Sequence, residues 1–309
     1  MRVLVMGSGG VGGYFGGLLA QAGEEAGFVA RGAQLAAMQE HGLRVHSVHG
    51  DFQIPVRARQ DPAEFGTADL ILFCVKAYDS EQAAGQLRPA IGPETAVLCL
   101  QNGVNAVERL EPYFGVGRVL PGTVYIDAAI EAPGLIDQPS SYRRIVFGEP
   151  HGPRSARVQR IAATLEHAAI EVDPRDDLNA GLWEKYLHIC ALSGMTGMTR
   201  SAIGPILACP DTRELYEESV RETYAVGRAA GVNLNDEIAE QTIQLAHRMR
   251  PDAKSSLLYD LEHGKPLEIE ILSGHLVDLG RRLGVPTPVQ RVIAAALRLA
   301  NGEAIGHRQ

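Results

Sequence analysis

The sequence predicts an α/β fold in which a doubly wound parallel sheet is followed by an all-helical C-terminal domain. In the first half, short apolar runs rich in β-branched residues alternate with helical patterns, which is typical of strands buried on both faces of a parallel sheet. From about Asp177 onward only long helical periods remain. At 309 residues the chain also exceeds the usual size of a single core, so two domains are expected.

The strands and helices of the first half follow one another in order. Strands are expected at residues 2–7, 27–31, 68–77 and 95–103, and they are followed by helices that begin near Val11, Ala33, Ser80 and Asn105. A hairpin-like insert covers residues 42–59. Further strands are expected at 118–129 and 143–147, and a helix at 154–167 with the short run 169–173 closes this half.

The second half reads as a series of helices. They are expected at residues 180–199, 212–230, 235–248, 252–262, 268–283 and 288–300. Gly231 and Gly284 stand where C-terminal caps belong, and Pro286 follows the second of them. The boundary lies in "EVDPRDDLN", where Pro174 and clustered aspartates end the preceding run, so we assign the domains to residues 1–176 and 177–309.

Composition and charge exclude several classes of function. A net charge of −8 disfavours a nucleic-acid or anionic-membrane binder, since both partners require a basic surface. The N-terminal apolar run is too short for a signal peptide and no long uncharged apolar stretch exists, which favours a cytoplasmic protein. The four cysteines form no CxxC pair and are expected to be buried free thiols. No metal site is expected, because the histidines of residues 41–49 have no carboxylate set beside them.

A glycine-rich turn after the first strand predicts a dinucleotide site. Gly7, Gly9 and Gly12 form a GxGxxG pattern between that strand and an amphipathic helix. These glycines permit a tight turn, close approach of a pyrophosphate, and packing of the helix on the strand, while the helix N-terminus attracts phosphate. The first domain is therefore Rossmann-type, and the cofactor-binding turn is expected to comprise Gly7, Ser8, Gly9, Gly10, Val11 and Gly12.

The end of the second strand indicates which dinucleotide binds. An NAD site requires Asp or Glu there, whereas this strand ends "FVAR" in Arg31. A guanidinium suits a 2′-phosphate, so NADP(H) is predicted; a simple surface arginine is the alternative. Lys76 and Asn102 follow two later strands, at the sheet edge where ligands of such folds bind. A strand-end cation and a turn asparagine are the alternatives for these two residues.

Longer stretches of the chain resemble the ketopantoate reductase (2-dehydropantoate 2-reductase) family over nearly the full length. The matching runs are "GSGGVGG", "VAR", "VKAYD", "QNGV", "LWEKYLHICAL" and "SSLLYDLEHGKPLEIEILSGHLVDLGRRLGVPTP". The resemblance implies NADPH-dependent reduction of 2-dehydropantoate to (R)-pantoate in pantothenate biosynthesis. It implies that Lys185 is the catalytic lysine and Glu268 its acidic partner that binds the substrate hydroxyl. Asn102 and Ser256 would then bind substrate, and Lys76 would line the cleft between cofactor and substrate.

Chemistry supports that assignment. Hydride delivered to a ketone carbon leaves negative charge on the oxygen, so a cation that can also donate a proton is a suitable catalyst. Glu268 would keep the lysine charged and in place, and hydroxyl and amide donors would meet the substrate carboxylate. Without the resemblance, Lys185 and Glu268 would read as helix-end charges and the serines at 255–256 as caps.

The sequence departs from the family pattern beside the lysine. In well-known members, asparagines follow the catalytic lysine by four and eight residues, and here Ile189 and Ser193 stand at those positions. Ser193 can still donate a hydrogen bond to substrate, but Ile189 makes this face more apolar. A related reductase of a different 2-oxoacid therefore remains an alternative, as does a non-catalytic NADP(H)-binding sensor. Apolar helical surface in the second half makes a homodimer a further expectation.

Overall fold

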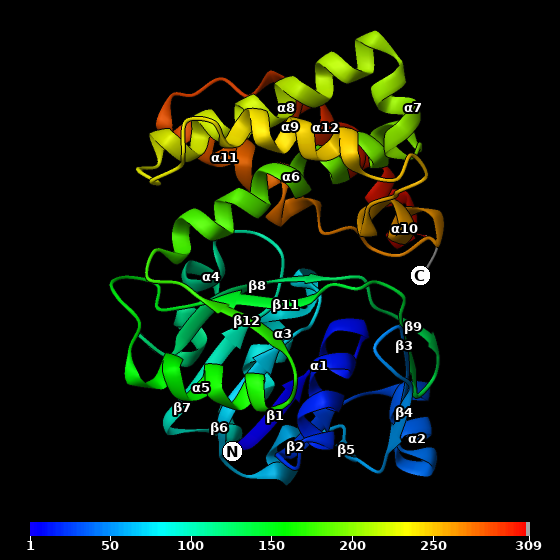
Figure 1. Cartoon of the computed structure of the whole chain (residues 1–309), viewed down its shortest axis with the longest axis vertical. Coiled ribbons are helices and arrows are strands. Elements are labelled where there is room, and N and C mark those ends of the chain that lie inside the picture. Colours follow the sequence, from blue (N-terminus) through cyan, green and yellow to red (C-terminus); the bar gives the residue numbers. More distant parts are fainter. Residues whose placement is uncertain (307–309) are drawn as a thin grey trace. The chain divides into compact units, whose positions relative to one another are not determined.

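The computed structural model describes residues 1–306 and divides into two compact units (Figure 1). The sheet unit holds Met1–Gln101 and Asn105–Leu178. The helical unit holds Asn102–Val104 and the chain from Asn179 onward. The predicted fold class, a Rossmann-type α/β domain followed by a helical domain, is confirmed.

The main sheet has eight strands in the order β12-β11-β8-β7-β6-β1-β2-β5. Neighbouring strands are parallel except for β8 and β11, which are antiparallel. No helix lies between those two strands, and strands joined without a helical crossover can pair antiparallel. The strands are β1 (Arg2–Met6), β2 (Glu25–Val29), β5 (Arg57–Arg59), β6 (Ala68–Phe73), β7 (Ile91–Cys99), β8 (Val119–Ile126), β11 (Arg143–Phe147) and β12 (Glu171–Pro174).

The structure contains a second, four-stranded sheet, of which the sequence predicted two strands. Its order is β4 (Phe52–Ile54), β3 (Leu43–Ser47), β10 (Leu135–Gln138) and β9 (Ala129–Ala132). The hairpin-like insert supplies β3 and β4, which pair antiparallel, and β10 joins β3 in parallel. Strands β9 and β10 were not predicted from the sequence, because each is four residues long and "APG" interrupts the pattern between them.

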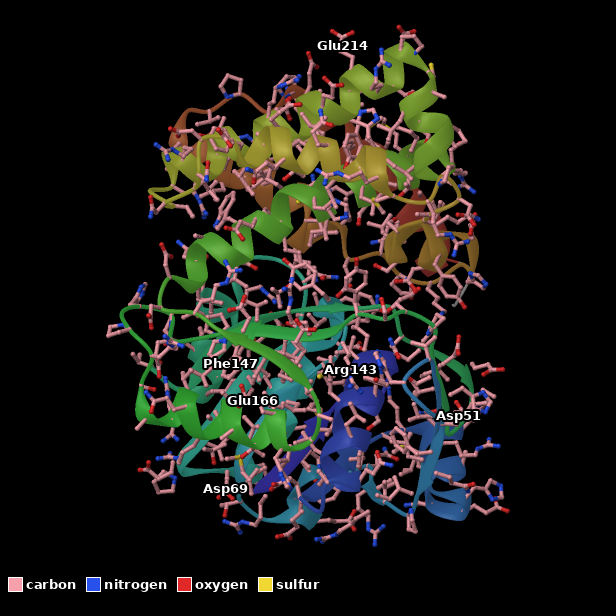
Figure 2. The ribbon with its side chains drawn as sticks, viewed as in Figure 1. Asp51, Asp69, Arg143, Phe147, Glu166 and Glu214 are labelled. Carbon is pink, nitrogen blue, oxygen red and sulfur yellow. The ribbon has the colours of Figure 1, made fainter. Side chains whose placement is uncertain are left out.

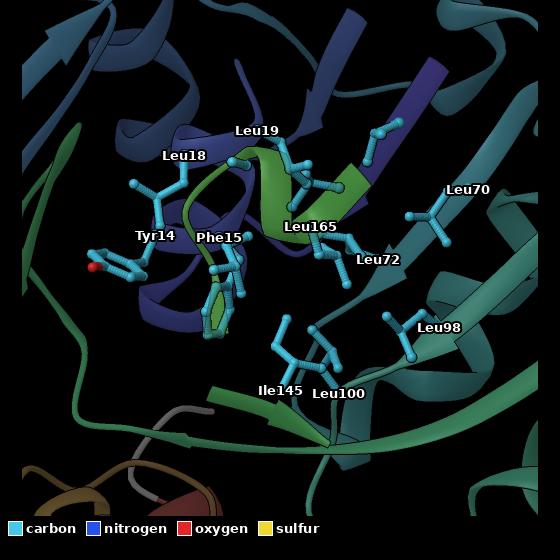
Figure 3. Close-up of a cluster of buried hydrophobic side chains, with 14 of the residues drawn as sticks. Tyr14, Phe15, Leu18, Leu19, Leu70, Leu72, Leu98, Leu100, Ile145 and Leu165 are labelled. Carbon is cyan, nitrogen blue, oxygen red and sulfur yellow. The ribbon is translucent and has the colours of Figure 1, made fainter. Parts of the chain in front are cut away.

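Helices cover both faces of the main sheet, as alternation along its strands requires. Val3 and Val5 face a core shared with α1 (Gly10–Gln21) and α5 (Ala156–His167). Figure 3 shows Phe15 and Leu19 of α1 in this cluster with Leu165 of α5. Residues of the opposite face pack against α3 (Ser80–Gln86) and α4 (Ala106–Phe114). The remaining helical segments of this unit are α2 (Gly32–His41) and the 3-10 turns η1 (Pro62–Phe65), η2 (Ala77–Asp79) and η3 (Arg88–Ala90).

The helical unit begins with the long apolar helix α6 (Leu178–Thr199). It continues with α7 (Ile203–Ala208), α8 (Pro210–Ala229), α9 (Ile238–Arg248), α10 (Ser256–Glu262), the 3-10 turn η4 (Ile269–Ile271), α11 (Ser273–Leu283) and α12 (Pro288–Gly306). Gly284 ends α11 in the left-handed conformation with φ 72°, as its position indicated.

The expected helix at 268–283 was wrong at its start. The chain makes the short turn η4 and breaks at Leu272, where φ is −104° and ψ is −114°, before α11 begins. The Tyr186 hydroxyl donates to the Leu272 carbonyl at 2.7 Å and also lies 3.2 Å from the Ile271 carbonyl oxygen. These carbonyls are therefore satisfied from α6, so a regular helix is not needed to satisfy them.

Apolar side chains are mostly buried and charged side chains mostly exposed, but one of the cysteines is exposed. Phe147 is fully buried in β11, whereas Asp51, Asp69 and Glu214 are exposed (Figure 2). Cys99 and Cys190 are buried free thiols and Cys74 is half-buried, but Cys209 is exposed, so the expectation of burial was wrong there. Cys209 precedes the first turn of α8 at the surface. Within residues 1–306, no helix has the length and apolar character needed to cross a membrane.

Candidate active site

The glycine turn between β1 and α1 has the shape that a pyrophosphate requires. Gly7 has φ 98°, in the region that favours glycine. A Cβ on Gly12 would lie 2.2 Å from the Gly7 carbonyl oxygen, so only glycine lets α1 pack this closely. A Cβ on Gly9 would meet nothing within 4 Å, which leaves open space in front of the turn. The first turn of α1 has no acidic residue, so its free N–H groups suit an anion.

The end of β2 is connected to this turn. The Ser8 hydroxyl donates to the Val29 carbonyl at 2.9 Å, and the Gln34 amide donates to the Ser8 carbonyl at 3.0 Å. Arg31 is the N-cap residue of α2, and its Nη2 lies 2.8 Å from Oδ2 of Asp79. The Arg31 side chain is 71% exposed, so its guanidinium remains accessible to a ligand.

The loops that follow β6 and β7 are joined by a buried polar cluster. Lys76 is half-buried and precedes η2. Gln101 is only 6% exposed, and its amide nitrogen donates to the Val75 carbonyl at 2.6 Å and to the Ser80 hydroxyl at 2.9 Å. Arg109 of α4 donates from Nη2 to the Gln101 amide oxygen at 2.8 Å. Sequence reasoning missed Gln101 and Arg109, since nothing in "QNGVNAVER" marks residues eight apart as partners.

Lys185 meets two other predicted site residues in the helical unit. It lies in the second turn of α6, and its Nζ donates to Oδ1 of Asn102 at 3.2 Å. Asn102 follows β7 in sequence, yet its contacts place it in the helical unit. Glu268 lies close enough for its negative charge to raise the Lys185 pKa. The structure therefore brings Lys185, Asn102 and Glu268 together.

Burial dominates the electrostatics around Lys185. Desolvation lowers the pKa of Lys185 from 10.5 to about 8, and the charge of Glu268 opposes that shift. His188, almost one helical turn further along α6, has its pKa lowered to about 4 by burial and then by the Lys185 charge. Its Nδ1 atom is buried without a hydrogen-bond partner among the described residues. Sequence reasoning missed His188, although its spacing of three from Lys185 places both on one face.

The predicted serines lie in different settings. Ser193 is 6% exposed on α6, two turns beyond Lys185, and half-buried Ile189 lies between them. Ser256 is exposed at the first position of α10. Ser255 caps that helix, since its hydroxyl accepts from the Leu258 amide at 3.0 Å, and it also shares a hydrogen bond of 2.6 Å with Thr196. The cap is thus Ser255, and the Ser256 hydroxyl is left on the surface of the unit.

Two protein-family models match this chain, one in each half. The family model described as ketopantoate reductase PanE/ApbA matches residues 3–152, and its C-terminal companion matches residues 177–301. The chain belongs to this family of oxidoreductases. The resemblance stated from the sequence is confirmed.

Two relatives of the chain match it along nearly their whole length. The chain is 33% identical to a 2-dehydropantoate 2-reductase of Mesorhizobium japonicum, covering 97% of this chain and 98% of that protein. It is 31% identical to YkpB, an uncharacterized oxidoreductase of Bacillus subtilis, covering 98% of this chain and all of that protein.

Solved structures show the same fold. A PanE/ApbA family ketopantoate reductase from Ralstonia eutropha has a TM-score of 0.91 at 33% identity, with 98% of this chain and 99% of that chain covered. D-mandelate dehydrogenase in a complex with NADH and anilino(oxo)acetate has a TM-score of 0.90 at 18% identity, covering 98% of this chain and 99% of that one. At that identity the likeness concerns the fold alone.

Proposed function

We propose that this protein catalyses the NADPH-dependent reduction of 2-dehydropantoate to (R)-pantoate, with Lys185 as general acid, as a step of pantothenate biosynthesis. The observation that carries the proposal is the hydrogen bond of 3.2 Å from the Lys185 ammonium to Asn102, with the Glu268 charge beside it. Membership of the ketopantoate reductase family and a curated 2-dehydropantoate 2-reductase at 33% identity support it.

In this proposal the two domains have separate tasks. Residues 1–176 bind NADP(H), and residues 177–309 bind substrate and carry the acid. The cofactor-binding residues are Gly7, Ser8, Gly9, Gly10, Val11, Gly12, Arg31, Lys76 and Asn102. The positive φ of Gly7, the open space at Gly9 and the close packing at Gly12 suit a dinucleotide, and exposed Arg31 suits its 2′-phosphate.

Lys185 provides the proton and part of the charge stabilisation. Bound NADPH would supply the hydride to the ketone carbon. As charge develops on the ketone oxygen, the Lys185 ammonium stabilises it and donates the proton that completes the alcohol. A pKa of about 8 suits this role, because the ammonium is mostly protonated at neutral pH yet gives up its proton more readily than an ordinary lysine.

The other site residues bind and orient the substrate. Glu268 accepts a hydrogen bond from the substrate hydroxyl and its charge favours the protonated form of Lys185. The Asn102 carboxamide holds the ammonium through Oδ1, which leaves its amide nitrogen to donate to substrate. Ser193 and Ser256 supply hydroxyl donors for the substrate carboxylate.

Ile189 favours a second candidate, an NADPH-dependent reductase of a different 2-oxoacid. It lies one turn beyond Lys185 on α6, where well-known members of the family have an asparagine. An apolar side chain there offers no hydrogen bond to a polar substituent and would tolerate a hydrophobic one. His188 adds a buried imidazole nitrogen without a hydrogen-bond partner among the described residues, one position before Ile189.

An NADPH-oxidation assay with purified protein distinguishes the candidates. We expect the highest kcat/KM with 2-dehydropantoate among a panel that also contains pyruvate, 2-oxoisovalerate and phenylglyoxylate. A strong preference for another acid would establish the second candidate instead. NADPH binding without turnover of any acid would leave only the non-catalytic sensor. An Ile189→Asn variant provides the matched comparison, since it restores the family's residue and should raise efficiency with 2-dehydropantoate relative to the other acids.

We also propose that the protein assembles as a homodimer. The helical unit exposes large apolar side chains that single-chain packing leaves uncovered, among them Leu245, Val292 and Leu299, with exposures of 47%, 60% and 72%. Light scattering coupled to size-exclusion chromatography should give twice the mass of one chain, and a monomer at micromolar concentration would rule the dimer out.

A further inference from the structure

Arg31 and Asp79 form an ion pair that joins the two sides of the end of β1. In the main sheet β1 lies between β2 and β6. Arg31 follows β2, and Asp79 ends the turn η2 that follows β6. Their side chains meet at 2.8 Å between Nη2 and Oδ2, and both residues belong to the sheet unit. Ligands of such sheets bind outside the carboxyl ends of the strands where the strand order reverses, which here is the end of β1.

The pair combines a side chain that favours NADPH with one that favours NADH. A guanidinium beside the adenosine ribose attracts the 2′-phosphate of NADPH, whereas a carboxylate accepts from the free 2′-hydroxyl of NADH and repels a phosphate. Asp79 engages one of the guanidinium nitrogens, and its negative charge offsets part of the attraction of Arg31 for an anion. The Arg31 and Asp79 side chains are 71% and 31% exposed, so the pair is solvated and a bound ligand can displace it.

We infer that Asp79 is a specificity-determining residue of the cofactor site, and that it weakens the preference for NADPH over NADH that Arg31 creates. The inference rests on the proposed function, since it assumes that Arg31 faces the cofactor ribose. It goes further by assigning a role to Asp79, to which the family resemblance gave none. The protein should accordingly bind both dinucleotides, with a preference for NADPH that is smaller than an unpaired arginine would produce.

Replacing the carboxylate with its neutral isostere tests this directly. In an Asp79→Asn variant we expect the preference for NADPH over NADH to rise about 3- to 10-fold, as the loss of one nearby negative charge in a solvated setting predicts. The change should appear as a lower Kd for NADPH, while the Kd for NADH does not fall. Cofactor fluorescence measures both constants without any turnover.

Asp176→Asn is the matched control. Asp176 pairs with Arg154 at 3.0 Å on the surface of the same unit, in a different part of its sequence, and its removal should leave the preference unchanged. If Asp79→Asn leaves the preference unchanged or lowers it, Asp79 does not oppose the 2′-phosphate and the inference is wrong while the proposed function stands. If the unmodified protein binds neither dinucleotide, the proposed function fails and the inference fails with it.

Discussion

The Lys185 ammonium lies 3.2 Å from the Asn102 amide oxygen, although the two residues are 83 positions apart in the chain. A lysine with a lowered pKa that is held by an amide and faced by a carboxylate is an arrangement suited to proton transfer rather than to stability. Lys185→Met should therefore reduce kcat by about 10²- to 10⁴-fold, because it removes the proposed proton donor and leaves a side chain of similar length.

The same variant should still bind NADPH, because the glycine turn and Arg31 are untouched. Lys254→Met is the matched control, since Lys254 is an exposed lysine of the same unit, paired with Glu262 at 2.7 Å. Its turnover should match that of the unmodified protein. Unchanged turnover of Lys185→Met would exclude Lys185 as the acid.

Activity should fall as pH rises through the Lys185 pKa. In the proposed mechanism the ammonium is the proton donor, and burial lowers its pKa to about 8, so the active protonated form disappears above that pH. The pH profile of kcat/KM should therefore have a descending limb near pH 8. A flat profile between pH 7 and 10 would contradict the assignment.

The contribution of Lys185 to stability should rise with pH, whereas activity should fall. The folded-state pKa of Lys185 is below the ordinary value of 10.5, so between about pH 8 and 10.5 the unfolded chain binds more protons. The contribution of Lys185 to the free energy of unfolding therefore rises with pH across that window and is least favourable below pH 8. Lys185→Met should stabilise the protein at pH 7 by about 1–3 kcal/mol, and its advantage should shrink by pH 10. Thermal unfolding of both proteins at the two pH values measures the difference.

The glycine turn predicts two different outcomes for the same substitution. Gly9→Ala places a methyl group in open space, so the Tm should hardly change while the Kd for NADPH rises at least about tenfold through loss of close approach. Gly12→Ala places a methyl group 2.2 Å from the Gly7 carbonyl oxygen, so the fold itself should be destabilised. Equal effects of the two variants on Tm would refute this division of roles.

The buried cluster around Gln101 should position the loops on which Lys76 and Asn102 lie. Arg109→Met leaves the Gln101 amide oxygen without its charged donor, and we expect a loss of about 1–3 kcal/mol of stability. KM for NADPH and for the oxoacid should rise more than kcat falls. Arg88→Met, at an exposed arginine of the same unit, should change neither constant. If Arg109→Met lowers stability but leaves both KM values unchanged, the cluster stabilises the fold and does not position the loops.

The order of strands and helices could be predicted because their signals are local. Residues 70–73 of β6 form a buried apolar run, and Gly284 ends α11 where a glycine cap was expected. The strands β9 and β10 were missed since each is only four residues long, and β10 gains its place in the sheet from pairing with β3, which is distant in sequence. The break at Leu272 was missed for the same reason, because the Tyr186 hydroxyl that satisfies its carbonyl comes from another helix.

The sequence by itself determined the fold class and the glycine turn after the first strand, because glycine spacing and hydrophobic periodicity act over a few residues. The family was indicated separately, by the resemblance of longer runs of the chain to its members. Only the tertiary structure brought Lys185 to Asn102, gave His188 its buried nitrogen and set Asp79 against Arg31. The physical reason is that desolvation and charge pairing depend on distance in space, which local patterns do not encode.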